Sequence, residues 1–200
     1  MNKSESLNEL TDALKCLPRV GPKSALRLTY YLLQRNREGA KNLALSIDKA
    51  LSKLDHCELC NNFTEEIICS ICNSGKRDSS IICVVEMPTD LLMLEQTHSF
   101  KGMYFVLMGR LSPLDGVGPK DIHLNKLIKR IKDSDSEIKE VILATNFTSE
   151  GSATAQYISD LLKDTSIKIS RIARGLPMGG EIEYVDTGTL AQAVVERKIL

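Results

Sequence analysis

The sequence predicts an α/β protein made of several parts: an N-terminal helix–hairpin–helix, a four-cysteine knuckle, a parallel-sheet domain, and a C-terminal tail with a strand and a helix. Leucines recur at helical spacing through residues 1–54, and two C-x₂-C pairs follow within residues 55–76. Between residues 80 and 175, short apolar strands alternate with helical stretches, which is typical of a parallel sheet covered on both faces. Residues 176–200 form the tail, an expected oligomerisation or partner segment that could complete its own sheet or cross to a neighbouring subunit.

The composition is that of an ordinary globular protein. The 200 residues are 42% hydrophobic and 26% charged, with a formal net charge of zero. No apolar run approaches the roughly 20 residues that a membrane span needs, and the N-terminus lacks the apolar stretch of an export signal. We therefore expect a cytoplasmic protein with reduced thiols and no membrane association.

Three helices are predicted in the N-terminal part. The first runs through Leu7 and Leu14 and ends before Pro18. The second opens at Gly21-Pro22, because proline is tolerated at the first helical position. A third helical pattern leads through Leu43 to Leu54.

The turn between the first two helices has the chemistry of a DNA-backbone contact. Seven lysines and arginines lie between residues 15 and 41, against one acid. Arg19, Lys23 and Arg27 are spaced by four residues, so Lys23 and Arg27 share a helix face. Backbone N–H groups of residues 20–24 at the helix N-terminus can bind a phosphate oxygen. The alternative is a packing hairpin whose basic side chains are simply solvated.

The cysteine spacing is the clearest chemical signal in the chain. Two C-x₂-C pairs separated by eight residues predict a tetrahedral site for one structural Zn²⁺ per chain. Four thiolates leave no open position for water or substrate, so the metal would be structural. Two disulfides or a rubredoxin-like iron site are the alternatives. The four ligands would be Cys57, Cys60, Cys69 and Cys72.

The sheet domain is predicted from its alternating apolar runs. Strands are expected at residues 81–86, 104–108, 140–145 and 167–170, with helices at 89–96, 121–132 and 152–163. Cys83 is expected to be buried in the first strand, and Cys16 beside leucines of the first helix. The histidines are scattered, and no serine or cysteine occupies a nucleophile-elbow setting, so no catalytic nucleophile is predicted.

Carboxylates follow two of these strands at the edge where open parallel sheets bind ligands. Glu86 ends the first strand, Asp90 lies one helical turn later, and Glu150 follows Thr145-Asn146. A two-metal phosphoryl-transfer site would need several converging carboxylates. Thr145 and Asn146 are neutral where a second acidic pair would be expected, which weakens that prediction. The alternative is that these acids cap the following helices.

Several long phrases in a fixed order resemble the RecR family of bacterial recombination mediators. They are the cysteine motif together with LPRVGPKSALRL, ICVVEMPTDLLMLE, RLSPLDGVGP, LATNFTSEG and ARGLPMGGEIEYVDTGTL. The resemblance covers the whole chain and implies a Toprim-like parallel-sheet domain. It also implies a non-catalytic DNA clamp that forms ring-like homo-oligomers, dimers or tetramers, in the bacterial cytoplasm at the nucleoid. The implied partners are RecO, RecF, and DNA at gaps and single-strand–double-strand junctions, where the recombinase is loaded.

The resemblance also assigns roles to individual residues. DNA contacts of the family's hairpin fall on Lys23 and Arg27, beside Arg19, and the zinc ligands fall on the four cysteines. The acidic positions implicated in partner contact fall on Glu86, Asp90 and Glu150.

Four positions depart from the family pattern. Arg19 and Met108 stand where glycine is usual, and Phe147 and Ser152 where proline and glutamate are common. Two other functions remain open on the sequence alone. One is a magnesium-dependent Toprim-type nuclease or nucleotidyl transferase, and the other is a zinc-stapled interaction module without a DNA role.

Overall fold

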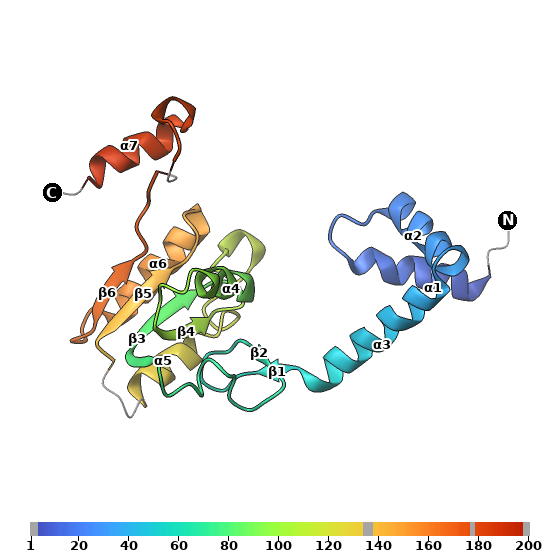
Figure 1. Ribbon diagram of the computed structural model, residues 1–200, viewed down its shortest axis with the longest axis horizontal. Coiled ribbons are helices and arrows are strands. Elements are labelled where there is room, and N and C mark those ends of the chain that lie inside the picture. The colour runs from blue at the N-terminus through green and yellow to red at the C-terminus, as the bar shows by residue number, and fades with distance from the viewer. Residues whose placement is uncertain (1–3, 134–137, 177–178, 198–200) are drawn as a thin grey trace. The chain divides into compact units, whose positions relative to one another are not determined.

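The computed structural model describes residues 4–133, 138–176 and 179–197 (Figure 1). The chain divides into two compact units, Met1–Leu54 and Asp55–Leu200. Residues 1–3, 134–137, 177–178 and 198–200, which belong to the predicted N-terminal part, sheet domain and tail, lie outside the described residues.

The first unit is helical, as predicted. Its elements are α1 (Glu5–Ala13), the 3₁₀ turn η1 (Leu14–Cys16), α2 (Pro22–Gln34) and α3 (Arg37–Lys53). Helices α1 and α2 pack through Thr11 and the buried Thr29, whose hydroxyl oxygens are 3.0 Å apart. Asn36 caps α3 by accepting the Gly39 N–H at 2.9 Å. The expected burial of Cys16 is wrong, because this residue ends the exposed turn that leads out of α1.

The second unit begins with the cysteine knuckle. Strands β1 (Asp55–His56) and β2 (Phe63–Thr64) form a two-stranded antiparallel sheet. The Cys57 N–H donates to the Asn62 carbonyl at 2.8 Å and closes the tight turn between them. This turn brings the first C-x₂-C pair to one side of the chain.

A four-stranded parallel sheet follows. Its strands are β3 (Asp78–Val85), β4 (Gly102–Val106), β5 (Glu140–Ala144) and β6 (Lys168–Arg171), in the order β4-β3-β5-β6. All three pairings are parallel, so the predicted parallel sheet is confirmed. The carboxyl ends of β3 and β5 are neighbours, since Val85 is in register with Ala144.

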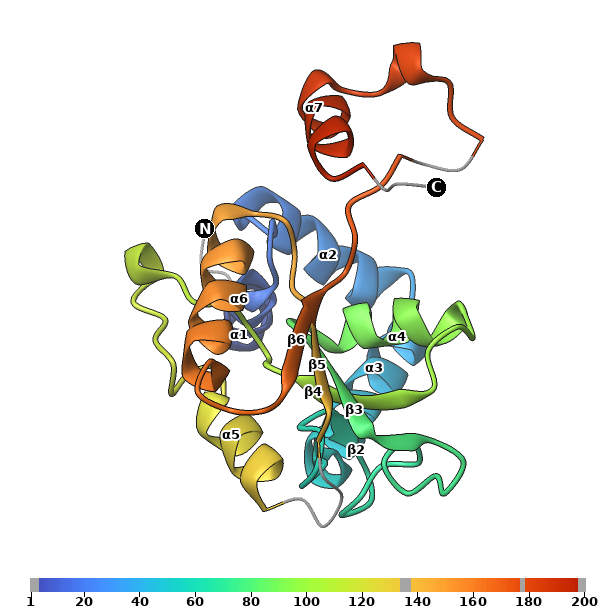
Figure 2. The same cartoon turned by 90° about the vertical axis from the view of Figure 1, so that its left-hand side faces the viewer.

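Helices cover both faces of this sheet. Helices α5 (Leu124–Lys132) and α6 (Ser149–Leu162) lie on one face, and α4 (Pro88–Gln96) lies on the other (Figure 2). Successive β3 side chains alternate between two cores: Ile82 and Val84 face α5 and α6, while Cys83 and Val85 face α4. The near-continuous apolar runs of the sequence reflect this burial on both sides.

The remaining segments are short. A 3₁₀ turn, η2 (Pro113–Asp115), precedes α5, and the tail contains η3 (Ile182–Tyr184) and α7 (Thr187–Val195). The predicted C-terminal helix is present, with Asp186 as its cap. The strand expected before it is not found in the described part of the tail, where η3 stands instead. Among the described residues, no helix is long and apolar enough to cross a membrane.

Candidate DNA-binding and metal sites

The hairpin turn presents unpaired N–H groups at the start of α2. Gly21 and Pro22 open the helix, and the amides of Gly21, Lys23 and Ser24 have no acceptor among the described residues. The amide of Val20 was expected to be free as well. It is not, because it donates to the Leu17 carbonyl at 3.1 Å and closes the turn.

Three cations lie just before and within the first two turns of α2. Arg19, Lys23 and Arg27 are exposed, and none forms an ion pair with another described residue. Lys15, by contrast, lies 2.5 Å from the Asp12 carboxylate. Unpaired cations next to free amides suit the oxygen of a phosphate backbone, which needs no base-specific contact.

Arg19 has an unusual backbone conformation in this turn. Its φ of 65° is in the left-handed region, where glycine is favoured. Met108 shares this property, with a φ of 61°. Both residues therefore stand at positions whose geometry explains why the family pattern has glycine there.

The four cysteines converge on one point. The sulfur atoms of Cys57, Cys60, Cys69 and Cys72 all lie within 4.8 Å of one another, and the four residues are buried. The Cys60 and Cys69 sulfurs are 3.5 Å apart, which is too far for a disulfide and close to the roughly 3.8 Å edge of a tetrahedron with Zn–S bonds of about 2.3 Å. This arrangement fits one tetrahedral metal ion.

Backbone amides also donate to these sulfurs. The Cys69 N–H donates to the Cys57 sulfur at 3.3 Å, and the Cys72 N–H to the Cys69 sulfur at 3.5 Å. Burial raises the pKa of Cys57, but amide donors outweigh it, and the pKa falls to about 7. A hydrogen bond with Cys72 and burial raise the pKa of Cys60, and burial raises that of Cys69 to about 11. Thiolates are the ligand form, so metal binding competes with protonation.

The knuckle is joined to the outer edge of β4. The Val106 N–H donates to the Cys60 carbonyl at 2.8 Å, and the Asn61 side chain donates to the Val106 carbonyl at 2.8 Å. Arg130 of α5 reaches the carbonyls of Leu59 and Tyr104. Neither Asn61 nor Arg130 was predicted as a structural residue. Asn61 follows a C-x₂-C pair in left-handed conformation (φ 61°), a position that asparagine tolerates.

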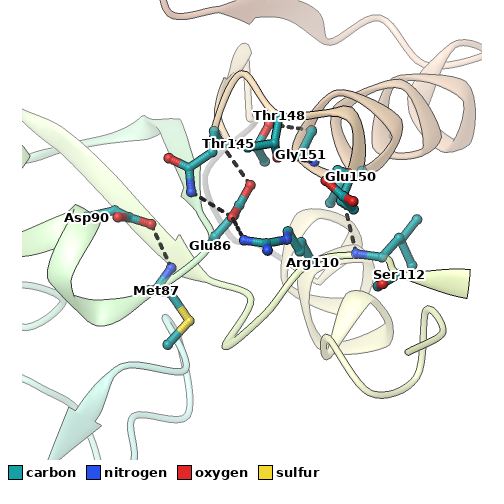
Figure 3. A network of polar contacts seen from close by, with 12 residues as sticks. Glu86, Met87, Asp90, Arg110, Ser112, Thr145, Thr148, Glu150 and Gly151 are labelled. Carbon is teal, nitrogen blue, oxygen red and sulfur yellow. Dashed lines mark hydrogen bonds and ion pairs between the residues drawn. The ribbon is translucent and has the colours of Figure 1, made fainter. Parts of the chain in front are cut away.

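Glu86 lies at the carboxyl end of β3 and is only 1% exposed. Its Oε1 accepts the Asn146 N–H and its Oε2 accepts the Asn146 side-chain amide, each at 2.8 Å. Arg110 Nη1 lies 3.7 Å from the same Oε2 (Figure 3). The carboxylate is thus held by the backbone amide and the side-chain amide of Asn146 and by the guanidinium of Arg110.

The start of α6 packs closely on this carboxylate. Thr148 caps the helix by accepting the Gly151 N–H at 3.1 Å. A Cβ at Gly151 would meet the Asn146 carbonyl at 2.3 Å and the Glu86 Oε1 at 2.6 Å. Glycine at position 151 therefore permits the approach of α6 to the Glu86–Asn146 contact.

The other two predicted carboxylates do not join Glu86. Asp90 accepts the Met87 N–H at 2.9 Å and caps α4, as the alternative interpretation expected. Glu150 lies in the first turn of α6, and Figure 3 shows it on the opposite side of Glu86 from Asp90. A metal site needs at least three acidic, histidine or cysteine side chains close together. Within residues 4–133, 138–176 and 179–197, the four cysteines are the one such group. The acids of the sheet edge do not form a two-metal site.

Family models match three consecutive parts of this chain. A model of the RecR helix–hairpin–helix matches residues 7–51, and a Toprim domain model matches residues 80–173. A model of the RecR C-terminal region matches residues 175–198. The chain belongs to the RecR family. The two RecR models and the Toprim model together identify the family, so the predicted resemblance is confirmed. RecR membership implies DNA binding and a role in DNA repair and recombination.

Proposed function

We propose that this protein is a non-catalytic DNA clamp that acts with RecO and RecF to load the recombinase onto single-stranded DNA at gaps. The hairpin carries the proposal: at the start of α2, three amides and three nearby cations have no acceptor or ion pair among the described residues. This surface binds a phosphate backbone of any sequence, as a mediator at random gaps requires. The bacterial cytoplasm, at the nucleoid, is the location that this role needs.

The state of Glu86 supports a non-catalytic role. A metal-dependent nuclease needs carboxylate oxygens free to bind the ion. Both oxygens of Glu86 are already occupied by Asn146, and Arg110 supplies a positive charge that opposes a bound cation. In this proposal Glu86 holds the Asn146 loop in place, and the partly exposed Asp90 and Glu150 face a protein partner such as RecO.

Zinc is the proposed occupant of the cysteine knuckle. The four sulfurs form a closed thiolate set of tetrahedral dimensions, with amide donors to two of them. Such a site stabilises a small fold and leaves no coordination position for substrate.

A homo-oligomeric ring is proposed from the apolar surface of α3. No residue of this helix is buried, although leucines and an isoleucine recur along one face. A helix stripe of this kind normally packs against another element. The exposed residues of the stripe are Leu43, Ile47 and Leu51, and the exposed Leu54 follows directly after the helix.

One double variant and a matched control test the proposed DNA contact. Lys23→Ala with Arg27→Ala should weaken binding to gapped DNA and reduce the slope of log affinity against log salt by about 2, because two phosphate contacts are lost. The Tm should be nearly unchanged, since both side chains are exposed. Binding would be measured by fluorescence anisotropy over a salt series. The matched control is Lys41→Ala with Lys49→Ala, two exposed lysines of α3, which should leave the slope unchanged.

The same samples separate the clamp from the enzyme. Gapped DNA incubated with wild-type protein and Mg²⁺ should remain intact on a denaturing gel while it shifts on a native gel. Cleavage that disappears in Glu86→Gln would contradict the non-catalytic role. An unchanged affinity in the Lys23–Arg27 double variant would contradict the hairpin contact.

A further inference from the structure

An exposed aromatic ring lies against two arginines beyond the carboxyl end of β5. Phe147 follows Asn146 and is 41% exposed. The guanidinium carbons of Arg171 and Arg174 lie 4.4 and 4.6 Å from the centre of its ring. We call these three residues the Phe147 cluster. The clamp function as proposed makes no use of them.

Arg171 is the fixed member of the cluster. Its Nη2 donates to the Asn146 carbonyl and to the Ser152 hydroxyl, each at 3.2 Å. Its Nε is buried and has no hydrogen-bond partner among the described residues. Burial and the positive charge of the neighbouring Arg174 lower the pKa of Arg171. Nearby carboxylates therefore do not fully neutralise the two positive charges.

Arg174 is the accessible member. Its one ion pair among the described residues joins it to Glu196, just after α7, at 4.0 Å. Both side chains of this pair are partly exposed, so the contact contributes little energy and can be exchanged for another anion. Glu86 does not compete for Arg174, because Asn146 and Arg110 already occupy its carboxylate.

A partly exposed aromatic ring with guanidinium groups close to it is suited to single-stranded nucleic acid. An unpaired base stacks on an exposed ring or on a guanidinium plane, and the adjacent phosphate accepts hydrogen bonds from arginine. The bases of a duplex are already stacked on one another and cannot supply this contact. The chemistry therefore selects unpaired strands.

We propose that the Phe147 cluster binds single-stranded DNA, with an unpaired base stacked on Phe147 and the neighbouring phosphate held by Arg174 in place of the Glu196 carboxylate. The inference rests on the proposed function in taking DNA as the ligand. It differs in its residues and in its selectivity, since the hairpin reads only the backbone. Glu196 then acts as an internal competitor that lowers the affinity of the cluster.

The test compares one labelled oligonucleotide with its blunt duplex, using the full-length protein and fluorescence anisotropy. Phe147→Ala and Arg174→Ala should each weaken single-strand affinity about fivefold or more and leave duplex affinity within about twofold. Glu196→Gln should strengthen single-strand affinity, because it removes the competing charge. Phe147→Leu keeps the apolar contact with Arg171 but loses aromatic stacking, so it should behave like Phe147→Ala.

Matched controls locate the effect. Tyr184→Ala removes another exposed aromatic residue, 81% exposed, outside the cluster and should change nothing. Arg174→Lys retains the charge without the planar guanidinium and should give an intermediate loss. The emission of a fluorescent purine analogue in the oligonucleotide should change on binding to wild-type protein and not on binding to Phe147→Leu, because only the wild type moves the base from its neighbours onto an aromatic ring.

The outcomes separate this site from the hairpin. Single-strand affinity unchanged in both Phe147→Ala and Arg174→Ala would overturn the inference and leave the cluster as a surface for a protein partner. Equal losses for single strand and duplex would also overturn it. If only the Lys23–Arg27 double variant loses DNA affinity, the hairpin contact is supported and the Phe147 cluster is not a DNA site. If only the variants of the Phe147 cluster lose DNA affinity, the single-strand site is supported and the hairpin contact is not. Wild-type protein that binds neither the single strand nor the duplex would contradict both sites.

Discussion

At the scale of single residues, the hairpin combines a strained backbone with a useful charge. Arg19 occupies a left-handed conformation that is unfavourable for any residue with a Cβ, yet it places a third cation beside the free amides of α2. A glycine at this position would remove the strain and the charge together. In the proposed DNA contact, the turn therefore trades some stability for phosphate affinity.

Arg19→Gly should separate these two effects. We expect the free energy of unfolding to rise by up to about 1 kcal/mol, because glycine tolerates the positive φ. Affinity for DNA should fall, because one cation is lost. Urea unfolding and anisotropy on the same preparation would measure both. Lys23→Gly, at a right-handed position in the first turn of α2, should destabilise the protein instead, and a stability gain there would contradict this explanation.

The residues of the candidate sites differ in how far sequence could identify them. The four cysteines were predicted as a set because their ligand geometry is encoded in local spacing. The role of Glu86 was not, because its partner Asn146 is 60 residues away and the pairing depends on β3 and β5 being neighbours. Phe147 was identified only as a departure from the family pattern, since its two arginines come from β6 and the segment that follows it.

At the scale of elements, we expect the knuckle to depend on the proposed metal for its fold. Its two strands are two residues each, and three of its bonds to the sheet domain come from backbone or side-chain groups next to the cysteines. Without the ion, little apolar surface would remain to hold these groups in position.

Cys57→Ser should release the metal and lower the Tm, because one of four thiolate ligands is lost. Metal content would be measured by elemental analysis and the Tm by calorimetry. Cys16→Ser is the matched control: this cysteine is exposed outside the knuckle, so zinc content and Tm should match the wild type. Full zinc occupancy in Cys57→Ser would mean that the ligand set is wrong.

The elements themselves were largely predictable. Every strand of the parallel sheet was placed within three residues at each end, because apolar runs between helical stretches mark buried strands. The prediction of a strand in the tail was wrong for a physical reason. The alternation in residues 181–185 favours a strand, but a strand needs a neighbour to pair with, and the described tail offers none.

At the scale of the whole molecule, the apolar stripe of α3 predicts self-association. Leu51→Glu should convert the oligomer to smaller species, because a charge at an 80% exposed stripe position would be buried in the proposed interface. Light scattering after size exclusion would give the mass. Leu45→Glu is the control, since Leu45 is 68% exposed but lies off the stripe. Equal masses for wild type and Leu51→Glu would place the interface elsewhere.

The attachment of the knuckle to β4 has a consequence for assembly in a metal-poor cell. Strands β4 and β6 are the two borders of the four-stranded sheet, and Cys60, Asn61 and Arg130 occupy hydrogen-bonding groups on the β4 border. A sheet with one closed border can gain at most one foreign strand, so pairing stops at two molecules. Loss of a bound ion would release the Cys60 and Asn61 contacts with Val106, and this part of the second border could then accept another strand, although Arg130 of α5 would still hold the Tyr104 carbonyl. The ion would thus limit polymerisation as well as stabilise the fold.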